Sequence, residues 1–174
     1  YAQWTIKSVT CTAGYYLGKG ALSCTQCECG HYCSGGTFNY NASSVQGRTA
    51  CGAGTYNSGT GASAASACKT TDPGHYAVAG SCNQKEVDEG CYGGAGSKGA
   101  CPNSCPSPYS SSVAGSDAVN DCYLTTTAGN YVKETGKGQV PCAAGGYCLG
   151  GTKVYHSSGV GDTTGGRTVC ECGT

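Results

Sequence analysis

Four closely spaced cysteines and one histidine are the side chains best suited to metal binding or redox chemistry: Cys24, Cys27, Cys29, Cys33 and His31. Thiolates and an imidazole at such short spacings are ligands that Zn²⁺ accepts in proteins. Cys24-x-x-Cys27 also has the spacing of a redox dithiol, although no strand-then-helix pattern surrounds it to activate a thiol. The related stretch from Cys142 to Cys148 lacks the additional thiols, whereas disulfides explain both stretches. We therefore interpret the cluster as disulfides and predict no metal and no cofactor.

Other catalytic chemistry has little support in the sequence. The three histidines, His31, His75 and His156, share no motif with an acid or a nucleophile. Acidic residues gather between positions 86 and 89, which is more typical of a solvated loop than of a calcium site. No nucleophile elbow, phosphate-binding loop, dinucleotide fingerprint or pair of catalytic carboxylates is present in the sequence. The sequence predicts that this protein is not an enzyme.

Composition indicates that cross-links replace a conventional hydrophobic core. Leu, Ile, Val and Phe together number 17 of 174 residues, below the roughly 20% that an ordinary core needs. Cysteine reaches 16 residues, and ten basic and ten acidic residues cancel, as in a disulfide scaffold and unlike a disordered chain. We predict few free thiols and an oxidising, extracellular or cell-surface environment. The predicted disulfide cysteines are Cys11, Cys24, Cys27, Cys29, Cys33, Cys51, Cys68, Cys82, Cys91, Cys101, Cys105, Cys122, Cys142, Cys148, Cys170 and Cys172.

The order of cysteine, glycine and tyrosine recurs along the chain. The run C-x-x-G-x-Y-C-x-G-G-T begins at Cys27 and returns at Cys142, and R-T-x-C at Arg48 returns at Arg167. Such internal repetition indicates a tandem array. A G-x-Y turn opens each of three repeats, and we expect most disulfides to join cysteines of one repeat. The predicted segments are residues 1–10, which complete a neighbouring repeat, then repeats at 11–67, 68–121 (divergent) and 122–174 (truncated).

Regular secondary structure is expected to be sparse, because glycine supplies 31 residues and alternating apolar runs are few. The best candidates for short strands are residues 5–10, 131–133 and 153–155. Residues 63–67 and 117–121 each suit a single helical turn before a cysteine. We expect the tyrosine rings to lie over adjacent disulfides and to form most of the small core. The predicted fold class is small and disulfide-rich: an elongated tandem array of about three Cys-rich repeats with short β-hairpins and little helix.

The repeated C-x-x-G-x-Y order, followed by small residues and a further cysteine, resembles the ephrin-receptor-like repeats of the growth-factor-receptor Cys-rich superfamily. Those repeats are similar in look to tumour-necrosis-factor-receptor modules, and the resemblance covers nearly the whole chain. The stretches between the cysteines are rich in Ala, Gly, Ser and Thr. In this they resemble protist surface proteins, including ciliate immobilisation antigens and the Cys-rich proteins of flagellar mastigonemes. The resemblance implies an elongated rod of stacked disulfide loops, and such repeats occur in receptors, secreted matrix proteins and surface proteins.

The surface features favour a secreted glycoprotein. Asn41-Ala-Ser43 is an N-glycosylation sequon in a polar loop, while the N-x-C sequences at Asn103 and Asn120 place their cysteines where disulfides are needed. The neutral charge balance and the absence of a Lys/Arg cluster argue against nucleic acid as a partner. No stretch approaches the roughly 20 apolar residues of a membrane span. Because the sequence starts at Tyr1, we expect a processed form or a piece of a longer protein.

Two functions remain open. One is a structural subunit of an extracellular filament or surface coat, and the other is a ligand-binding Cys-rich ectodomain of a receptor-like protein. Grouped aromatic or arginine anchors would mark a receptor face, yet the only arginines, Arg48 and Arg167, hold equivalent repeat positions, which favours the structural role. We expect head-to-tail assembly with copies of this chain, because the C-terminal residues lack half a repeat that the N-terminal residues resemble. The predicted assembly residues are Tyr1, Trp4, Ile6, Cys172 and Thr174.

Overall fold

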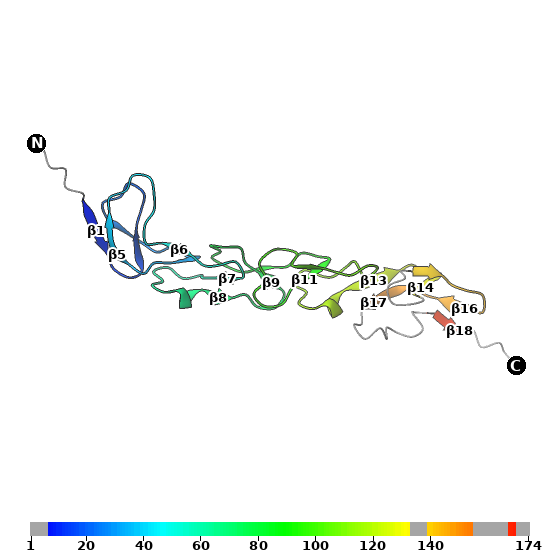
Figure 1. The fold of residues 1–174 in the computed structure, drawn as a ribbon. Helices are drawn as coiled ribbons and strands as arrows, with labels where there is room; N and C mark the ends of the chain where they lie inside the picture. Colours follow the sequence, from blue (N-terminus) through cyan, green and yellow to red (C-terminus); the bar gives the residue numbers. More distant parts are fainter. Residues whose placement is uncertain (1–6, 133–138, 155–166, 170–174) are drawn as a thin grey trace, which may run out of the picture. The chain divides into compact units, whose positions relative to one another are not determined.

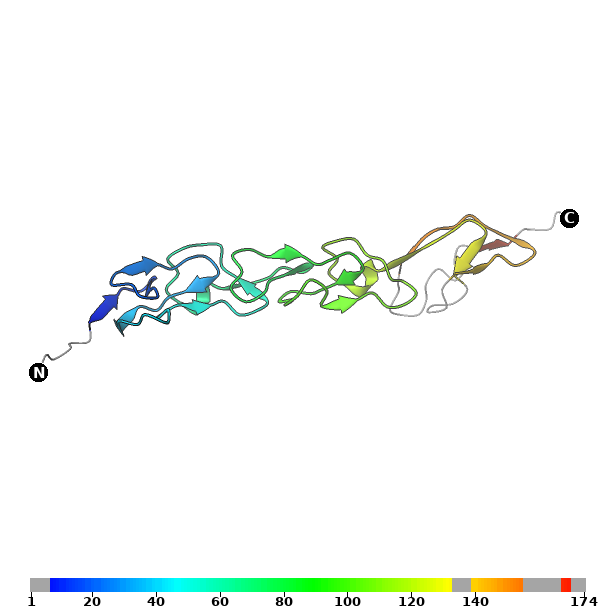
Figure 2. The ribbon, with the colours of Figure 1, turned by 90° about the horizontal axis from the view of Figure 1, so that it is seen from above.

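In a computed structural model the chain forms short strand pairs joined by turns and bends, and the structure describes residues 7–132, 139–154 and 167–169. Its sheets are all two-stranded over these ranges. Two 3₁₀ turns are the only helical elements in the described part of the chain. Figures 1 and 2 show that the strands are short throughout and that irregular loops separate them. The prediction of a small disulfide-rich fold with short strand pairs and little helix is confirmed at this level.

The elements have the following bounds. The first nine strands are β1 (Ser8–Cys11), β2 (Tyr15–Leu17), β3 (Cys24–Gln26), β4 (His31–Tyr32), β5 (Gly36–Asn39), β6 (Thr49–Ala50), β7 (Thr55–Tyr56), β8 (Lys69–Thr70) and β9 (His75–Tyr76). The others are β10 (Lys85–Glu86), β11 (Cys91–Tyr92), β12 (Asn103–Ser104), β13 (Tyr123–Thr126), β14 (Asn130–Val132), β15 (Gln139–Pro141), β16 (Gly146–Cys148), β17 (Gly151–Val154) and β18 (Arg167–Val169). The 3₁₀ turns are η1 (Ala65–Ala67) and η2 (Val119–Asp121).

Strand pairing is partly local and partly between strands distant in sequence. The neighbouring pairs are β2–β3, β7–β8, β9–β10, β11–β12 and β14–β15, and the distant pairs are β1–β5, β4–β6, β13–β17 and β16–β18. The expected strand positions agree with β1, β14 and β17 to within a few residues, and the two expected helical turns correspond to η1 and η2. The expectation of hairpins was too simple, because four of the pairs enclose other strands between their partners.

The chain divides into two compact units. The first unit contains Tyr1–Asp72, Tyr76–Lys85 and Ala95–Gly99, and the second contains Pro73–His75, Glu86–Gly94 and Ala100–Thr174. The segments between residues 72 and 100 alternate between the two units, so neither unit is one uninterrupted stretch of sequence.

Seven glycines make the same kind of turn. Each lies two residues before a tyrosine and has a positive φ between 75° and 87°, a conformation that favours glycine because it has no Cβ. The turn glycines are Gly14, Gly30, Gly54, Gly74, Gly90, Gly129 and Gly145. Three such turns were expected from the sequence, so the local structural unit is shorter than a predicted repeat. We use the word layer for the seven residues centred on a turn glycine.

Backbone hydrogen bonds join successive layers of the first unit. The N–H of Gly14 donates to the carbonyl oxygen of Cys33 at 2.8 Å, and the N–H of Cys27 donates to the carbonyl oxygen of Gly14 at 2.8 Å. The same pair of bonds recurs at Gly30 and at Gly54. Because main-chain atoms make these bonds, this connection needs the turn geometry and tolerates different side chains.

The second unit contains the same connection. The N–H of Gly74 donates to the carbonyl oxygen of Gly93 at 2.7 Å, and the N–H of Val87 donates to the carbonyl oxygen of Gly74 at 2.9 Å. Corresponding bonds recur at Gly90 and at Gly129. In both units, a turn glycine therefore donates one hydrogen bond to a later chain segment and accepts a second hydrogen bond from that same segment.

The first residue of a layer is the main buried position. Six residues at this position are no more than 3% exposed: Cys11, Cys27, Cys51, Thr71, Val87 and Thr126. Of the tyrosines that follow the turn glycines, only Tyr16 is buried, and the residue after it, Leu17, is 1% exposed. The other tyrosines are less buried: Tyr147 is exposed, and the rest are half-buried, namely Tyr32, Tyr56, Tyr76, Tyr92 and Tyr131. Sulfur and small side chains therefore fill more of the core than the expected tyrosine rings do.

Candidate functional site: the disulfide and glycine framework

Seven disulfides join fourteen of the sixteen cysteines. The pairs are Cys11–Cys24, Cys27–Cys33, Cys29–Cys82, Cys51–Cys68, Cys91–Cys101, Cys105–Cys122 and Cys142–Cys148. Their Cα–Cα distances run from 4.9 to 5.9 Å, within the range that disulfides adopt. The remaining two cysteines, Cys170 and Cys172, lie outside the described residues.

Four disulfides lie within a predicted repeat and three cross a predicted boundary. Two of the crossing disulfides, Cys51–Cys68 and Cys105–Cys122, share a separation of 17 residues. Each closes a loop whose last turn is a 3₁₀ turn, η1 or η2. Cys11 does not have this role, although it begins a predicted repeat as Cys68 and Cys122 do, because it bonds to Cys24 only 13 residues later.

The cysteine cluster at residues 24–33 is divided among three disulfides. Cys24 bonds to the earlier Cys11, and Cys27 bonds to Cys33. Cys29 bonds to Cys82, which lies 53 residues later. None of the four sulfurs is therefore a free thiolate that could bind a metal. The Nδ1 atom of His31 is instead 3.1 Å from the carbonyl oxygen of Cys29. Across the described ranges, no group of three His, Cys, Asp or Glu side chains is placed to hold a metal ion.

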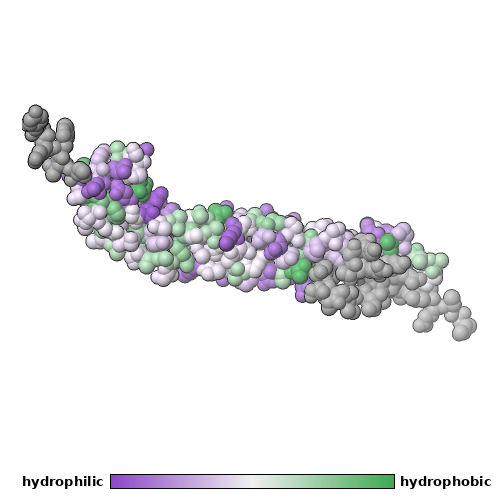
Figure 3. Space-filling model, viewed as in Figure 1, coloured by the Kyte–Doolittle hydropathy of each residue, from purple (hydrophilic) through white to green (hydrophobic). Residues whose placement is uncertain are grey.

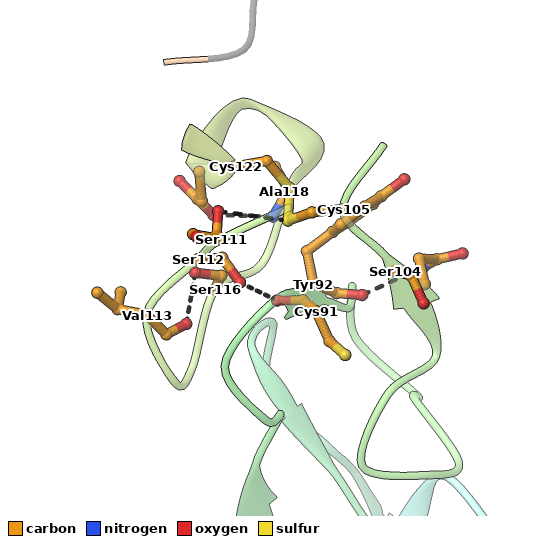
Figure 4. Close-up of a disulfide and its surroundings, with 12 residues drawn as sticks. Cys91, Tyr92, Ser104, Cys105, Ser111, Ser112, Val113, Ser116, Ala118 and Cys122 are labelled. Atoms are coloured by element: carbon orange, nitrogen blue, oxygen red, sulfur yellow. Dashed lines mark hydrogen bonds between the residues drawn. A yellow bond between two sulfur atoms is a disulfide. The ribbon is translucent and has the colours of Figure 1, made fainter. Parts of the chain in front are cut away.

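The loop closed by Cys105–Cys122 is held by side-chain hydrogen bonds as well as by its disulfide (Figure 4). The hydroxyl of Ser112, 3% exposed, donates to the carbonyl oxygen of Cys91 at 2.7 Å. The hydroxyl of Ser116 donates to the carbonyl oxygen of Val113 at 2.7 Å. Buried hydroxyls that donate to main-chain oxygens satisfy polar groups inside a core that has few apolar side chains.

Apolar side chains form a cluster at the same disulfide. Tyr109 is buried with the two cysteines, and Tyr92, Val119 and Leu124 pack against them. The carboxylate of Asp121 accepts hydrogen bonds from the N–H groups of the two residues that begin the final turn of the loop, Asp117 and Ala118. The loop therefore combines a covalent bond, a small apolar cluster and a capped turn.

Close contacts between glycines make a second part of the framework. A Cβ on Gly14 would lie 2.6 Å from the carbonyl oxygen of Gly61, closer than any real Cβ contact. The N–H of Gly61 in turn donates to the carbonyl oxygen of Cys27 at 2.7 Å. Three further pairs make the same approach: Gly30 with Gly80, Gly54 with Gly96, and Gly74 with Gly115. Glycine is needed at these turns both for its positive φ and for the approach of a neighbouring backbone.

A polar cluster in the first unit joins Tyr16, Glu28 and Arg48. The hydroxyl of Tyr16 donates to Glu28 Oε2 at 3.0 Å, and the guanidinium of Arg48 forms an ion pair with the same carboxylate. The guanidinium also lies 5.2 Å from the centre of the Tyr16 ring, a cation–π geometry. Burial, and after it the hydrogen bond to Glu28, raises the pKa of Tyr16.

The remaining predicted site residues have separate positions. Asn41 lies exposed in the loop between β5 and β6. The five predicted assembly residues, Tyr1, Trp4, Ile6, Cys172 and Thr174, lie outside the described residues. Sequence reasoning missed the polar cluster at Tyr16 and the close glycine pairs. The sevenfold G-x-Y pattern was the signal that could have revealed the layers, whereas no local pattern marks the glycine that approaches each turn.

Comparisons give this chain no established relatives. No known family matches the sequence, and neither a curated protein nor a solved structure is similar to it. The seven disulfides are typical of secreted and extracellular proteins. None of the helical elements in the described residues is long and apolar enough to cross a membrane. On the face in Figure 3, strongly hydrophobic residues lie scattered among neutral and hydrophilic ones.

Proposed function

We propose that this chain is a tandem array of Cys-rich repeats that serves as a structural subunit of an extracellular filament or surface coat. The observation that carries the proposal is the recurrence of one contact set, in which a turn glycine is hydrogen-bonded to the following layer and covered by a later glycine. The bonds at Gly14, Gly30 and Gly54 in the first unit and at Gly74 in the second support it. In repeat proteins, such nearest-neighbour contacts supply both the stability and the means of extension.

The chemistry of the recurring geometry supports a structural role over a catalytic one. The polar side chains with defined partners, such as Ser112, Ser116 and Asn57, bond to main-chain atoms of nearby segments. Their hydrogen-bonding capacity is therefore used to hold loops in place. The Cys-rich order resembles repeats of extracellular proteins, and the disulfides agree with that environment.

The proposed assembly is head to tail. A contact between two different ends of identical chains does not close on itself unless the geometry forms a ring, so it extends into a filament. The proposed contact residues are Tyr1, Trp4, Ile6, Cys172 and Thr174. Trp4 and Ile6 are among the largest apolar residues of a chain that has few, and their burial at a junction would contribute roughly 1.5–3 kcal/mol each.

The test compares the secreted chain with a variant that lacks residues 1–6. This deletion leaves β1 intact, since that strand begins at Ser8. We expect concentration-dependent polymers by sedimentation and filaments by electron microscopy, and loss of both in the deletion variant. The double substitution Lys7→Ser and Thr10→Ser, which keeps residues 1–6, is the control and should still polymerise. A chain that remains monomeric at all concentrations would overturn the assembly proposal.

The alternative, a ligand-binding ectodomain, is favoured by one observation. An open hollow in the second unit is lined in part by Val113, Ser116, Asn120 and Tyr123, and Val113 is 62% exposed. Exposed apolar residues at a hollow can mark a protein-binding surface. Binding of the monomeric chain to cells that is lost in Val113→Asp, with normal disulfides, would favour this function over assembly.

A further inference from the structure

We propose that Asn41 carries an N-linked glycan and that it is the single N-glycosylation site of this sequence. Three asparagines lie in acceptor sequences: Asn41 before Ser43, Asn103 before Cys105, and Asn120 before Cys122. The structure separates Asn41 from the other two by the residue two positions later, which is a serine after Asn41 and a disulfide-bonded cysteine after Asn103 and Asn120. The amide nitrogen of Asn103 is also used in a hydrogen bond. This inference does not depend on the proposed filament.

The side chain of Asn41 is oriented by its own loop. Its Oδ1 atom accepts hydrogen bonds from the N–H of Ser43 at 2.7 Å and from the N–H of Ser44 at 3.0 Å. Because the amide group is planar, binding Oδ1 to the loop directs Nδ2 to the opposite side of the group. All three residues are exposed. The amide nitrogen, which is the atom that would bear the sugar, therefore faces solvent.

The base of this loop is fixed. Leu17 and Gln46 exchange backbone hydrogen bonds of 3.0 and 2.9 Å, and the Gln46 side chain donates to the carbonyl oxygen of Asn39 at 2.8 Å. The N–H of Gly20 also donates to the carbonyl oxygen of Asn41 at 2.8 Å. None of these bonds uses the amide nitrogen of Asn41. A glycan at this position would leave every one of them in place.

Residues of the two N-x-C sequences already form bonds within the folded chain. The Nδ2 atom of Asn103 donates to the carbonyl oxygen of Tyr92 at 3.3 Å. Cys105 and Cys122, the third residues of the two sequences, form a disulfide with each other. Neither position has a free thiol after folding, and a glycan on Asn103 would replace one of the two hydrogens on a nitrogen that donates to the paired strand β11. Ser43 keeps its hydroxyl in the folded chain.

The modification requires a lipid-pyrophosphate-linked oligosaccharide as co-reactant. The Asn41 Nδ2 atom forms a bond to the anomeric carbon of the first sugar, and the bond from that carbon to the pyrophosphate oxygen breaks. The lipid pyrophosphate leaves with the bonding electron pair, and the amide nitrogen gives up one proton. No oxidation or reduction occurs. The product keeps the amide carbonyl, so the Oδ1 bonds to the loop remain possible.

The experiment uses the full chain secreted from eukaryotic cells. Intact mass and peptide mapping are recorded before and after treatment with a peptide N-glycosidase, which converts a glycosylated asparagine into aspartate. We expect one glycan, at Asn41, that is lost in Asn41→Gln and in Ser43→Ala. Asn39→Gln alters an exposed asparagine outside any sequon and is the matched control that should keep the glycan. Non-reducing peptide maps should give the same seven disulfides in all variants.

Two results would overturn the inference. One is a correctly disulfide-bonded secreted chain whose Asn41 is entirely unmodified. The other is a glycan on Asn103 or Asn120 in the folded wild-type chain. Since the disulfide map reports folding independently of the sugar, a variant that fails to fold is recognised and does not count as loss of the site.

Discussion

The β2–β3 pair of the first unit and the β14–β15 pair of the second have corresponding backbones held in different ways. Each follows a turn glycine, Gly14 or Gly129, whose carbonyl oxygen accepts a hydrogen bond from a cysteine N–H, at 2.8 and 2.7 Å. The strands before these turns also correspond, because β1 pairs with β5 in the register that β13 has with β17. The two pairs therefore share a backbone arrangement and differ in the side-chain bonds that hold it.

In the first unit a disulfide holds β1 and β3 together. Cys11 at the end of β1 bonds to Cys24 at the start of β3. In the second unit the corresponding residues are Thr126 and Gln139. The Thr126 hydroxyl donates to the carbonyl oxygen of Gly151 at 3.1 Å, and the Gln139 side-chain oxygen accepts from the N–H of Thr127 at 3.2 Å.

The difference shows which feature is primary. The backbone pattern persists where the disulfide is replaced by side-chain hydrogen bonds, as it also persists where Thr71 and Val87 stand at the buried layer position. The turn glycine is present in every case. The glycine geometry therefore defines a layer, and a disulfide is one of several ways to stabilise it.

The largest effect is expected from alanine at Gly14, compared with alanine at Gly129, the corresponding turn glycine of the second unit. Gly14 and Gly129 have φ values of 87° and 85°, so alanine at either costs about 1–2 kcal/mol for the left-handed conformation. At Gly14 the new Cβ also meets the carbonyl oxygen of Gly61, whereas at Gly129 it meets no described atom within 4 Å. Gly14→Ala should therefore lose roughly a further 1–3 kcal/mol.

Denaturant unfolding and amide hydrogen exchange at Cys27 and Cys142 measure these losses in each unit. Gly52→Ala is the control, because its Cβ would meet nothing and its φ is not in the left-handed region; little change is expected. Equal losses for Gly14→Ala and Gly129→Ala would mean that the contact with Gly61 contributes nothing.

A smaller effect is expected from removing the disulfide of the first unit or the corresponding side-chain hydrogen bond of the second. Cys11→Ser with Cys24→Ser opens a loop of 13 residues and should lower stability by about 2–4 kcal/mol. Gln139→Ala removes one exposed hydrogen bond and should cost at most about 1 kcal/mol. Unfolding of the non-reduced variants measures both.

The reciprocal exchange introduces a disulfide into the second unit. Thr126→Cys with Gln139→Cys places two thiols at the positions that correspond to Cys11 and Cys24, and we expect a new disulfide in non-reducing peptide maps. Two thiols that stay reduced under oxidising conditions would show that the two hairpins differ in backbone as well as in fastening.

Much of the local structure was predictable from the sequence. The short strands, the two single helical turns and the use of cysteine in disulfides follow from composition and from patterns within a few residues. The cysteine pairing was not predictable, because sixteen cysteines allow very many connectivities and spacing alone does not choose among them. Cys29–Cys82, separated by 53 residues, depends on how the layers stack.

The candidate site was predictable only where its signal is local. The sequon at Asn41 is a three-residue pattern, and its exposure follows from its place in a polar loop. The cluster of Tyr16, Glu28 and Arg48 brings together residues 12 and 20 positions apart, and no periodicity of a strand or helix relates them. Such contacts become visible only when the fold is known.

The smallest effect concerns this polar cluster, which marks a further difference between the two hairpins because Ala143 replaces Glu28 at the corresponding position of the second unit. Burial and then the hydrogen bond to Glu28 raise the pKa of Tyr16 in the folded chain. The stabilisation linked to the protonated phenol is therefore fully present below the unfolded value of about 10. It is lost as the pH rises through the folded pKa.

We expect the stability of the wild-type chain to fall more steeply between about pH 9 and pH 11 than that of Tyr16→Phe, which has no phenol to ionise. Glu28→Gln should give an intermediate slope, since it removes one of the causes of the shift but leaves burial. Tyr131→Phe, at the corresponding place in the second unit, controls for the loss of a tyrosine hydroxyl and should leave the Tyr16 contribution in place. Urea unfolding at each pH measures the slopes. If Tyr16→Phe and the wild-type chain lose stability in parallel over this range, the phenol is not held by Glu28, and the cluster contributes through Arg48 alone, whose guanidinium lies 5.2 Å from the centre of the Tyr16 ring.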